Sequence, residues 1–151
     1  MAVPRLSAWF GDPGAAYSYS GIEMTALPWT PLLAAMREQM QQLAAPFGDA
    51  SLNSVLVNLY RDGNDGVAWH ADDEPELGRE PLIVSVSLGA SRAFQLRRRD
   101  DPSVRRELDL HHGDIVVMHG LTQALWLHQV PKTSRHVGQR VNLTFRSIQW
   151  R

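Results

Sequence analysis

The pattern of apolar and polar positions changes near residue 50. Before that point, apolar residues recur every three to four positions, as they do on one face of a helix. These positions are Leu32, Met36, Met40 and Leu43. Thr30 suits the N-cap and Pro31 the first helical position, while Pro46 and Gly48 are expected to end the segment. The sequence therefore predicts one helix from about residue 31 to 45.

After residue 52 the chain consists of short apolar or alternating runs separated by Gly, Asp, Asn and Pro, which is typical of strands joined by turns. We predict strands at 53–60, 82–88, 93–98, 115–118, 124–130 and 140–149. The clearest breaks are the loop at 61–66 and the turn at 112–114. One helix followed by many short strands predicts a mainly β fold, a sandwich or jelly-roll barrel with a flanking helix.

Composition narrows the classes of protein that fit. With 151 residues, 44% hydrophobic and 21% charged, the chain is expected to form a single globular domain, 1–151. It has no apolar run long enough to cross a bilayer and no signal-peptide layout at its start, so we expect a cytoplasmic protein (nuclear in a eukaryote), monomeric and without membrane contact. There is no cysteine, so any metal must be bound by histidines and carboxylates. The net charge of -1 restricts nucleic-acid binding to a local patch.

The last predicted strand has one apolar and one polar face. Val141, Leu143 and Phe145 alternate with polar residues, and side chains alternate across a strand. The polar face carries Arg140, Asn142, Thr144 and Arg146. Most alternating strands are edge strands with one face in water. This face, however, combines two planar cationic groups with neutral hydrogen-bonding groups, which is what a small dicarboxylate requires.

The strand at 53–60 shows a weaker version of the same pattern. Asn58 and Tyr60 share one face, opposite a run of apolar residues. Such a pair is common on half-exposed strands. Both polar faces form a site only if they turn towards the interior of the fold.

Two H-x-D motifs are present, and a motif this short is expected by chance. His112-Gly113-Asp114 looks like a turn that begins a strand, with Asp114 bonded to the local backbone. His70-Ala71-Asp72 instead follows an apolar run and precedes further acidic residues. We therefore take His70 and Asp72 as the candidate metal ligands.

A third ligand must come from elsewhere in the chain, and His128 is the best candidate because it lies within an apolar strand. A buried histidine of purely structural role is the alternative. Two histidines and one carboxylate form the facial triad of non-haem iron(II) oxygenases, which leaves metal positions open for a co-substrate and dioxygen. We expect the other histidines, His111, His119 and His136, to face solvent or loops.

The region 53–146 resembles the catalytic core of the AlkB family of Fe(II)/2-oxoglutarate-dependent dioxygenases, which remove alkyl groups from nucleic-acid bases. Five stretches carry the resemblance, in the same order and spacing. They are Asn58-Leu59-Tyr60, His70-Ala71-Asp72-Asp73-Glu74, Ser85-Val86-Ser87-Leu88-Gly89, His128-Gln129-Val130-Pro131 and Arg140-Val141-Asn142-Leu143-Thr144-Phe145-Arg146. The last, R-x-N-x-T-F-R, is far more specific than H-x-D. Weaker similarity extends back through Trp29 and 17–21.

The resemblance implies a double-stranded β-helix with Fe(II) on His70, Asp72 and His128. It also implies that 2-oxoglutarate chelates the metal and that its far carboxylate pairs with Arg140. Other residues implied in the co-substrate pocket are Tyr60, Asn142, Asn58, Thr144 and Arg146. The implied reaction uses O2 to hydroxylate an N-alkyl group of a base such as 1-methyladenine or 3-methylcytosine in DNA or RNA. Formaldehyde, succinate and CO2 are the products.

Substrate contacts are implied less directly. Asp73 and Glu74 match positions that contact the damaged base, Arg92 one near the nucleic-acid strand, and Tyr17 and Tyr19 would belong to a lid over the flipped base. On this reading 1–50 forms a partial lid and outer helix and 51–151 the catalytic jelly roll. Family members usually carry a longer segment before the part equivalent to 3–5, so the resemblance implies that this segment is missing here and that substrate grip differs.

A cluster of arginines marks the region 92–106: Arg92, Arg97, Arg98, Arg99, Arg105 and Arg106. A solvated hairpin and a set of phosphate contacts are both consistent with it. Two other functions remain open at this stage: the same oxygenase chemistry on a protein or small molecule, and a non-catalytic cupin-like binding module. The complete triad and the two arginines of the last strand disfavour the binding module.

Overall fold

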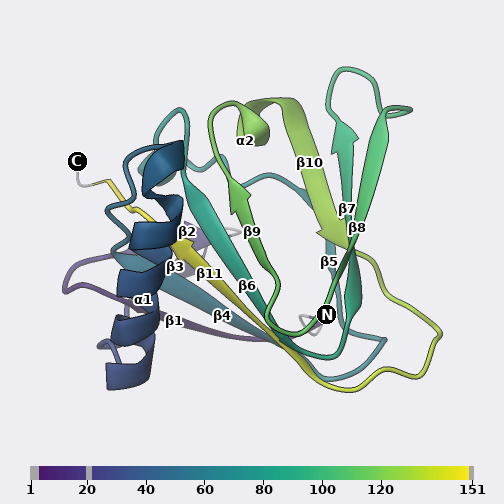
Figure 1. Cartoon of the computed structure of the whole chain (residues 1–151), viewed down its shortest axis with the longest axis horizontal. Coiled ribbons are helices and arrows are strands. Elements are labelled where there is room, and N and C mark those ends of the chain that lie inside the picture. Colours follow the sequence, from purple (N-terminus) through teal and green to yellow (C-terminus); the bar gives the residue numbers. More distant parts are fainter. Residues whose placement is uncertain (1–3, 20–21, 150–151) are drawn as a thin grey trace.

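Two antiparallel sheets face one another in the computed structural model, which describes residues 4–19 and 22–149 (Figure 1). The larger sheet has the order β1 (Leu6–Gly11), β4 (Ser54–Tyr60), β11 (Arg140–Arg146), β6 (Ile83–Gly89) and β9 (Ile115–Met118). The smaller has the order β5 (Val67–His70), β10 (Trp126–Val130), β7 (Arg92–Arg98) and β8 (Arg105–Leu110). A separate hairpin pairs β2 (Tyr17–Tyr19) with β3 (Ile22–Met24).

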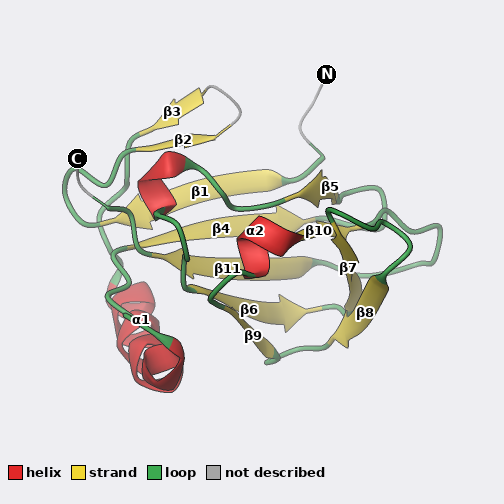
Figure 2. Ribbon diagram, turned by 90° about the horizontal axis from the view of Figure 1, so that it is seen from above, coloured by secondary structure: helices red, strands yellow, loops and turns green. Residues whose placement is uncertain are grey.

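Apolar side chains from both sheets fill the space between them. Ile83 and Met118 of the larger sheet pack with Phe94, Leu110 and Val130 of the smaller one. This arrangement is the jelly roll, or double-stranded β-helix, and it confirms the predicted fold class. Seen from above, the two sheets enclose the central space and the β2–β3 hairpin lies beside β1 (Figure 2).

Helix α1 (Pro31–Ala44) covers the outer face of the larger sheet. The Thr30 side chain accepts a hydrogen bond from Leu33 N, as predicted for the N-cap, and the short helix η1 (Ala45–Phe47) follows before Gly48. The predicted apolar face is partly wrong. Leu32 and Leu43 are exposed, and the residues packed on the sheet are Leu33, Met36, Met40 and Ala44. No helix in the described part of the chain is long and apolar enough to span a membrane.

All six predicted strands overlap an observed strand, but 124–130 begins two residues too early and 140–149 ends three residues too late. Residues 122–125 form the short helix α2 (Thr122–Leu125), and only then does β10 begin. Strands β1, β5 and β8, and the β2–β3 hairpin, were not predicted. A short helix η2 (Pro75–Leu77) follows the acidic segment after β5.

The register of the larger sheet turns its polar positions inward. Tyr60 of β4 lies opposite Arg140 of β11, and Asn58 lies opposite Asn142. On the other side of β11, Asn142 pairs with Ser87 of β6 and is buried. The polar faces of β4 and β11 therefore line the interior between the two sheets, which was the requirement for these two strands to form a site.

Candidate active site

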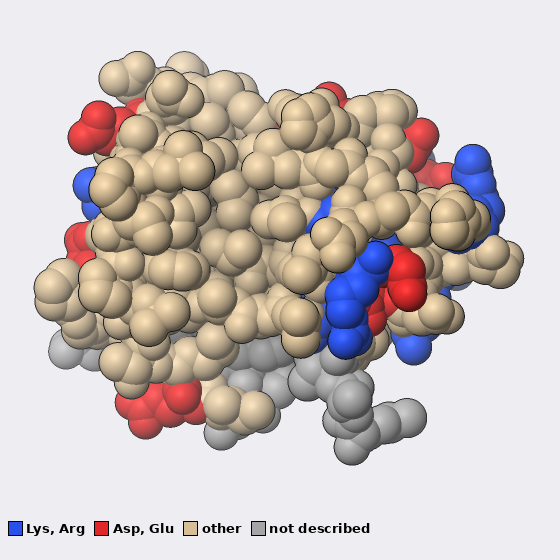
Figure 3. Space-filling model, turned by 90° about the horizontal axis from the view of Figure 1, so that it is seen from below, with Lys and Arg blue, Asp and Glu red and all other residues tan. Residues whose placement is uncertain are grey.

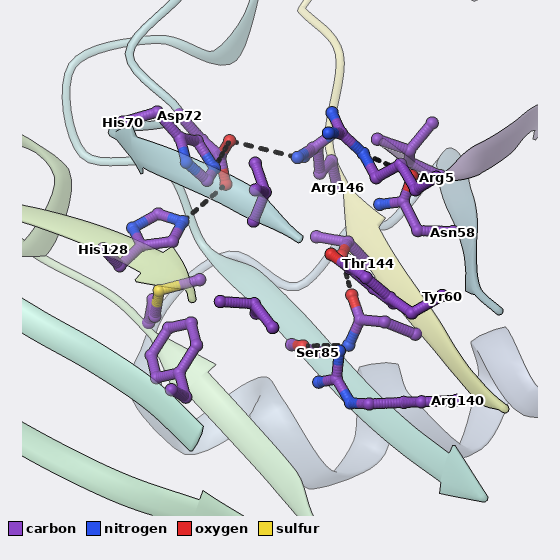
Figure 4. A pocket seen from close by; sticks show the side chains of 16 residues that line it. Arg5, Asn58, Tyr60, His70, Asp72, Ser85, His128, Arg140, Thr144 and Arg146 are labelled. Atoms are coloured by element: carbon purple, nitrogen blue, oxygen red, sulfur yellow. Dashed lines mark hydrogen bonds and ion pairs between the residues drawn. The ribbon is translucent and has the colours of Figure 1, made fainter. Parts of the chain in front are cut away.

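The three predicted metal ligands lie together at one side of the space between the sheets (Figure 4). His70 ends β5 and is opposite His128 in the adjacent β10, while Asp72 follows just after β5. One ligand atom of each residue lies within 4.8 Å of the others. The Nε2 atoms of His70 and His128 are 3.8 and 3.9 Å from the two carboxylate oxygens of Asp72. Two imidazoles and a carboxylate therefore converge on one point, as a facial triad requires.

The surroundings orient His70 and favour the metal-binding forms of His128 and Asp72. The Ala68 carbonyl, 2.8 Å from His70 Nδ1, can only accept, so Nδ1–H donates to it and Nε2 is the nitrogen that faces Asp72. Burial is the main cause that lowers the pKa of His128 to about 4, with smaller contributions from His70 and Arg146, so the His128 imidazole is neutral at pH 7. Burial alone would raise the pKa of Asp72, but Arg146 and the two histidines outweigh it and lower that pKa.

The opposite side of the same pocket holds a buried cation. Arg140 is 2% exposed and donates from Nη2 to Ser87 Oγ at 2.9 Å. Its guanidinium carbon lies 5.2 Å from the centre of the Tyr60 ring. The Tyr60 hydroxyl also interacts with this guanidinium, but within the described residues the Nε and Nη1 atoms have no acceptor in good hydrogen-bond geometry. A buried guanidinium with spare donors facing a cavity is a site for a carboxylate.

Neutral polar side chains connect the two ends of the pocket. Asn142 donates to Ser85 Oγ at 2.7 Å and to the Val86 carbonyl at 3.2 Å, and it accepts from Thr144 Oγ1 at 2.8 Å. Arg146 then reaches the metal ligands, because its Nη2 donates to Asp72 Oδ1 at 3.1 Å. The polar face of β11 thus extends from the carboxylate site to the triad.

The residues present fit Fe(II) and 2-oxoglutarate. Nitrogen and oxygen donors in a two-histidine, one-carboxylate set suit iron(II), and the ligand atoms meet at the pocket. The spare donors of Arg140, across the pocket from the triad, suit the far carboxylate of a dicarboxylate that also reaches the metal. This donor set is what the metal and its co-substrate need.

Comparison with known proteins agrees with this geometry. Residues 1–146 match the model of the 2OG-Fe(II) oxygenase superfamily. The chain is 42% identical over 154 positions to alpha-ketoglutarate-dependent dioxygenase alkB homolog 3 of Homo sapiens, an alignment that covers 96% of this chain and 52% of the relative. The chain belongs to the AlkB family.

Other AlkB relatives give the same assignment. DNA oxidative demethylase ALKBH2 of Homo sapiens is 38% identical over 154 positions, covering 97% of this chain and 58% of the relative. The solved structure of OsALKBH1 superposes with a TM-score of 0.60 at 25% identity, covering 93% of this chain and 77% of that one. The chain spans about half the length of the alkB homolog 3 relatives that it matches.

The structure gives less support to the residues expected to contact substrate in this AlkB protein than to the metal ligands. Asp73 is exposed beside Asp72, and its carboxylate binds Arg99 Nη2 at 2.6 Å. Glu74 is half-buried at the start of η2. Tyr17 and Tyr19 belong to β2, and their side chains lie outside the described part of the structure. Contacts of these four residues with a base remain predictions.

The prediction for Arg92 is wrong. This side chain is 3% exposed, and its guanidinium donates to the carbonyls of Asp62, Asp65 and Pro131 at 3.2, 2.8 and 2.8 Å. It also lies 5.7 Å from the centre of the Tyr60 ring. Three backbone acceptors hold Arg92 inside the fold, so it ties together the loops after β4 and β10 and cannot reach a phosphate.

Several pocket residues were given no role of their own from the sequence, although Ser85 lies in one of the five stretches that carry the resemblance. Arg5, Ser85, Phe94 and Met118 line the pocket. The Nε of Arg5 donates to Asn58 Oδ1 at 3.3 Å, a contact between residues far apart in sequence that no local pattern indicates. Ser85 did leave a signal, because Ser85 and Ser87 alternate with apolar residues exactly as the polar positions of β11 do.

Asp65, beside Arg92, yields a prediction about stability. Hydrogen bonds from the Arg61 side chain are the main cause that lowers the pKa of Asp65 to about 2. A folded-state pKa below the unfolded value of about 3.9 stabilises the protein above that pH, and this contribution is lost as the pH falls towards 2. Asp65→Asn should therefore lower the free energy of unfolding at pH 7 by about 1 kcal/mol. The effect is no larger because Arg61 is half-exposed and solvent screens its ion pair with Asp65. The free energy of unfolding of the variant and of the parent is measured in urea at pH 7 and at pH 3. The difference between the two proteins should be smaller at pH 3, and an equal difference at both pH values contradicts this account.

Proposed function

We propose that this protein is an Fe(II)/2-oxoglutarate-dependent dioxygenase that dealkylates N-alkylated nucleic-acid bases. The observation that carries the proposal is a single pocket with the His70–Asp72–His128 triad on one side and the buried Arg140 on the other. The first suits the metal and the second suits the far carboxylate of the co-substrate.

The side chains of the pocket have distinct roles in this proposal. His70, Asp72 and His128 bind Fe(II), and Arg146 keeps the Asp72 carboxylate charged and oriented. The far carboxylate binds Arg140, and Tyr60 packs beside that guanidinium. Asn58, Asn142 and Thr144 complete the 2-oxoglutarate pocket. When bound, iron and 2-oxoglutarate supply the oxidation by O2 that hydroxylates the N-alkyl carbon, which then leaves as formaldehyde, with succinate and CO2 formed from the co-substrate.

Two observations support nucleic acid as the substrate. The relatives include proteins named DNA oxidative demethylase. The β7–β8 hairpin also carries arginines beside aromatic rings, with the guanidinium carbon of Arg97 at 4.5 Å and that of Arg105 at 6.0 Å from the Trp69 ring centre. Arg99 joins this hairpin to Asp73, next to the triad. Figure 3 shows one face of the molecule, on which basic and acidic side chains lie next to one another and most of the surface is uncharged.

The test is formaldehyde release from short oligonucleotides that carry 1-methyladenine or 3-methylcytosine. Each lesion is offered in single- and double-stranded form, in DNA and in RNA, with Fe(II), ascorbate and 2-oxoglutarate. Unmethylated oligonucleotides are the control. We expect formaldehyde in proportion to succinate, and faster turnover of single strands, where no pairing energy opposes extrusion of the base.

The second candidate is the same oxygenase chemistry on a protein or small molecule. The pocket favours it as much as the first, because the triad and Arg140 define the co-substrate and not the group that is oxidised. Consumption of 2-oxoglutarate without formaldehyde from any methylated oligonucleotide would favour this candidate.

Binding of nucleic acid should depend on Arg97. Its guanidinium lies over Trp69, and among the described residues it forms no ion pair with a carboxylate. If it contacts a phosphate, Arg97→Ala makes the slope of log affinity against log salt concentration shallower by about 0.7 on single strands, the value for one released counterion. Affinity measured by fluorescence anisotropy at several salt concentrations gives this slope.

Arg98→Ala is the matched control. The Nε and Nη2 atoms of Arg98 are held by the Asp100 carboxylate at 2.8 and 2.7 Å, so its charge is already balanced. The slope should change much less in this variant. An unchanged slope in Arg97→Ala, or equal changes in both variants, contradicts phosphate binding at Arg97.

A further inference from the structure

The main chain at Asp72 is held by a side chain and not by its own strand. Asp72 lies beyond the end of β5, and the pairing of β5 with β10 reaches only as far as His70. The Arg146 guanidinium fixes its carboxylate from one side. A ligand in a loop segment needs a second constraint, since ligand geometry decides metal affinity.

Gln123 provides that constraint from the helix α2. Its Oε1 accepts the backbone N–H of Asp72 at 2.9 Å, and its Nε2 donates to Met118 Sδ at 3.4 Å. Because an N–H can only donate, the amide oxygen must face Asp72, which fixes the orientation of the side chain. Gln123 is 1% exposed and Asp72 is 1% exposed, so water does not compete for this bond.

The position of Gln123 in the chain links two ligands. Helix α2 runs directly into β10, which carries His128, so the backbone that places His128 also places Gln123. Its side chain then reaches across to Asp72, which lies far away in the sequence. One residue thereby fixes the loop ligand relative to the strand ligand.

We infer that Gln123 is a positioning residue of the metal site, which sets the place of the Asp72 carboxylate through the main-chain N–H of Asp72. The inference rests on the proposed metal site at His70, Asp72 and His128. Partners that orient metal ligands contribute about 10- to 100-fold to metal affinity. Loss of the amide oxygen should therefore weaken metal binding by this factor without removing any ligand.

Gln123→Met tests the inference, because methionine has a similar length and volume but no strong acceptor. Mn(II) is titrated into the metal-free protein and followed by calorimetry. We expect a dissociation constant raised 10- to 100-fold. In the metal-free protein the Asp72 amide should also exchange its hydrogen faster, because Gln123 supplies its only hydrogen bond in the described structure.

Gln129→Met is the matched control. Gln129 lies one residue after His128 on the same strand, and its amide donates to Gln95 Oε1 at 2.7 Å. The same chemical change next to the same ligand should leave Mn(II) affinity unchanged, whatever it does to the melting temperature. Equal losses in both variants, or none in Gln123→Met, overturn the inference.

Two further readouts keep the outcomes distinct. Gln123→Asn retains the amide but is one methylene shorter, so it should also weaken Mn(II) binding, and it decides the matter if Gln123→Met does not fold. A wild-type protein that binds no Mn(II) contradicts the proposed metal site. In that case exchange at the Asp72 amide still tests the bond, and unchanged protection in the variant overturns the inference.

Discussion

His128→Ala is expected to reduce formaldehyde release to background, a loss of at least about 1,000-fold, and His70→Ala and Asp72→Ala should do the same. Each ligand atom lies within 4.8 Å of the other two, so removing one leaves two donors for the metal. A lost ligand weakens iron binding and disturbs the open positions, at a cost of several kcal/mol, and each 1.36 kcal/mol is a factor of ten in rate. Metal content and turnover are measured on the same preparations.

The exposed histidines give the matched controls. His119→Ala and His136→Ala carry the same change, and both residues are exposed and outside the triad. They should keep turnover and metal content. If His119→Ala or His136→Ala removed activity while His128→Ala retained it, His128 is not the third ligand.

Asp72→Ala should in addition unfold more easily, because it removes the carboxylate bound by Arg146 in a buried setting.

The part of the site that could be predicted is the part where polar and apolar residues alternate along a strand. In β11 every second residue from Arg140 to Arg146 is polar, and a strand converts that spacing into a single face. The sequence did not reveal that this face is buried. That follows from the packing of the smaller sheet across this face of the larger sheet, in which β11 has the central place.

Strands without their own apolar pattern escaped prediction. In β8 the run from Arg105 to Asp109 is exposed, and only Leu110 is buried. This strand exists because its backbone pairs with β7 at the edge of the smaller sheet, where charged side chains are common. Helix α2 was missed for a different reason, since four residues make one turn and show no helical period.

Contacts between a side chain and a backbone group far away in the sequence could not be predicted either. Arg92 looked like one more member of an exposed basic cluster, yet it binds carbonyls from two separate loops. Gln123 directly precedes the predicted strand at 124–130, and its partner Asp72 is in another part of the chain. Both contacts depend on how the sheets come together, and this is set by tertiary packing and not by local pattern.

Arg140→Lys is expected to raise the concentration of 2-oxoglutarate needed for half-maximal turnover by about 30- to 160-fold. Lysine keeps the charge but replaces a planar, two-pronged donor with a single ammonium group. A single ammonium group cannot reproduce the fixed planar set of donors with which Arg140 binds Ser87 Oγ and still has N–H groups to spare for a carboxylate. Loss of a charged hydrogen bond in a buried site costs about 2–3 kcal/mol, which corresponds to this change in affinity.

The co-substrate affinity is measured directly by anaerobic titration of 2-oxoglutarate into the Mn(II)-loaded protein, which excludes turnover. Nucleic-acid affinity serves as the internal control and should be unchanged, since Arg140 is 2% exposed and lies inside the pocket. Arg105→Lys on the exposed hairpin makes the same exchange outside the pocket and should leave 2-oxoglutarate binding as it was. Equal 2-oxoglutarate affinity in Arg140→Lys and the parent would refute the assignment of the carboxylate to this guanidinium. The triad would then remain a metal site, because its geometry does not depend on Arg140, but the co-substrate would need another anchor among the pocket cations Arg5 and Arg146.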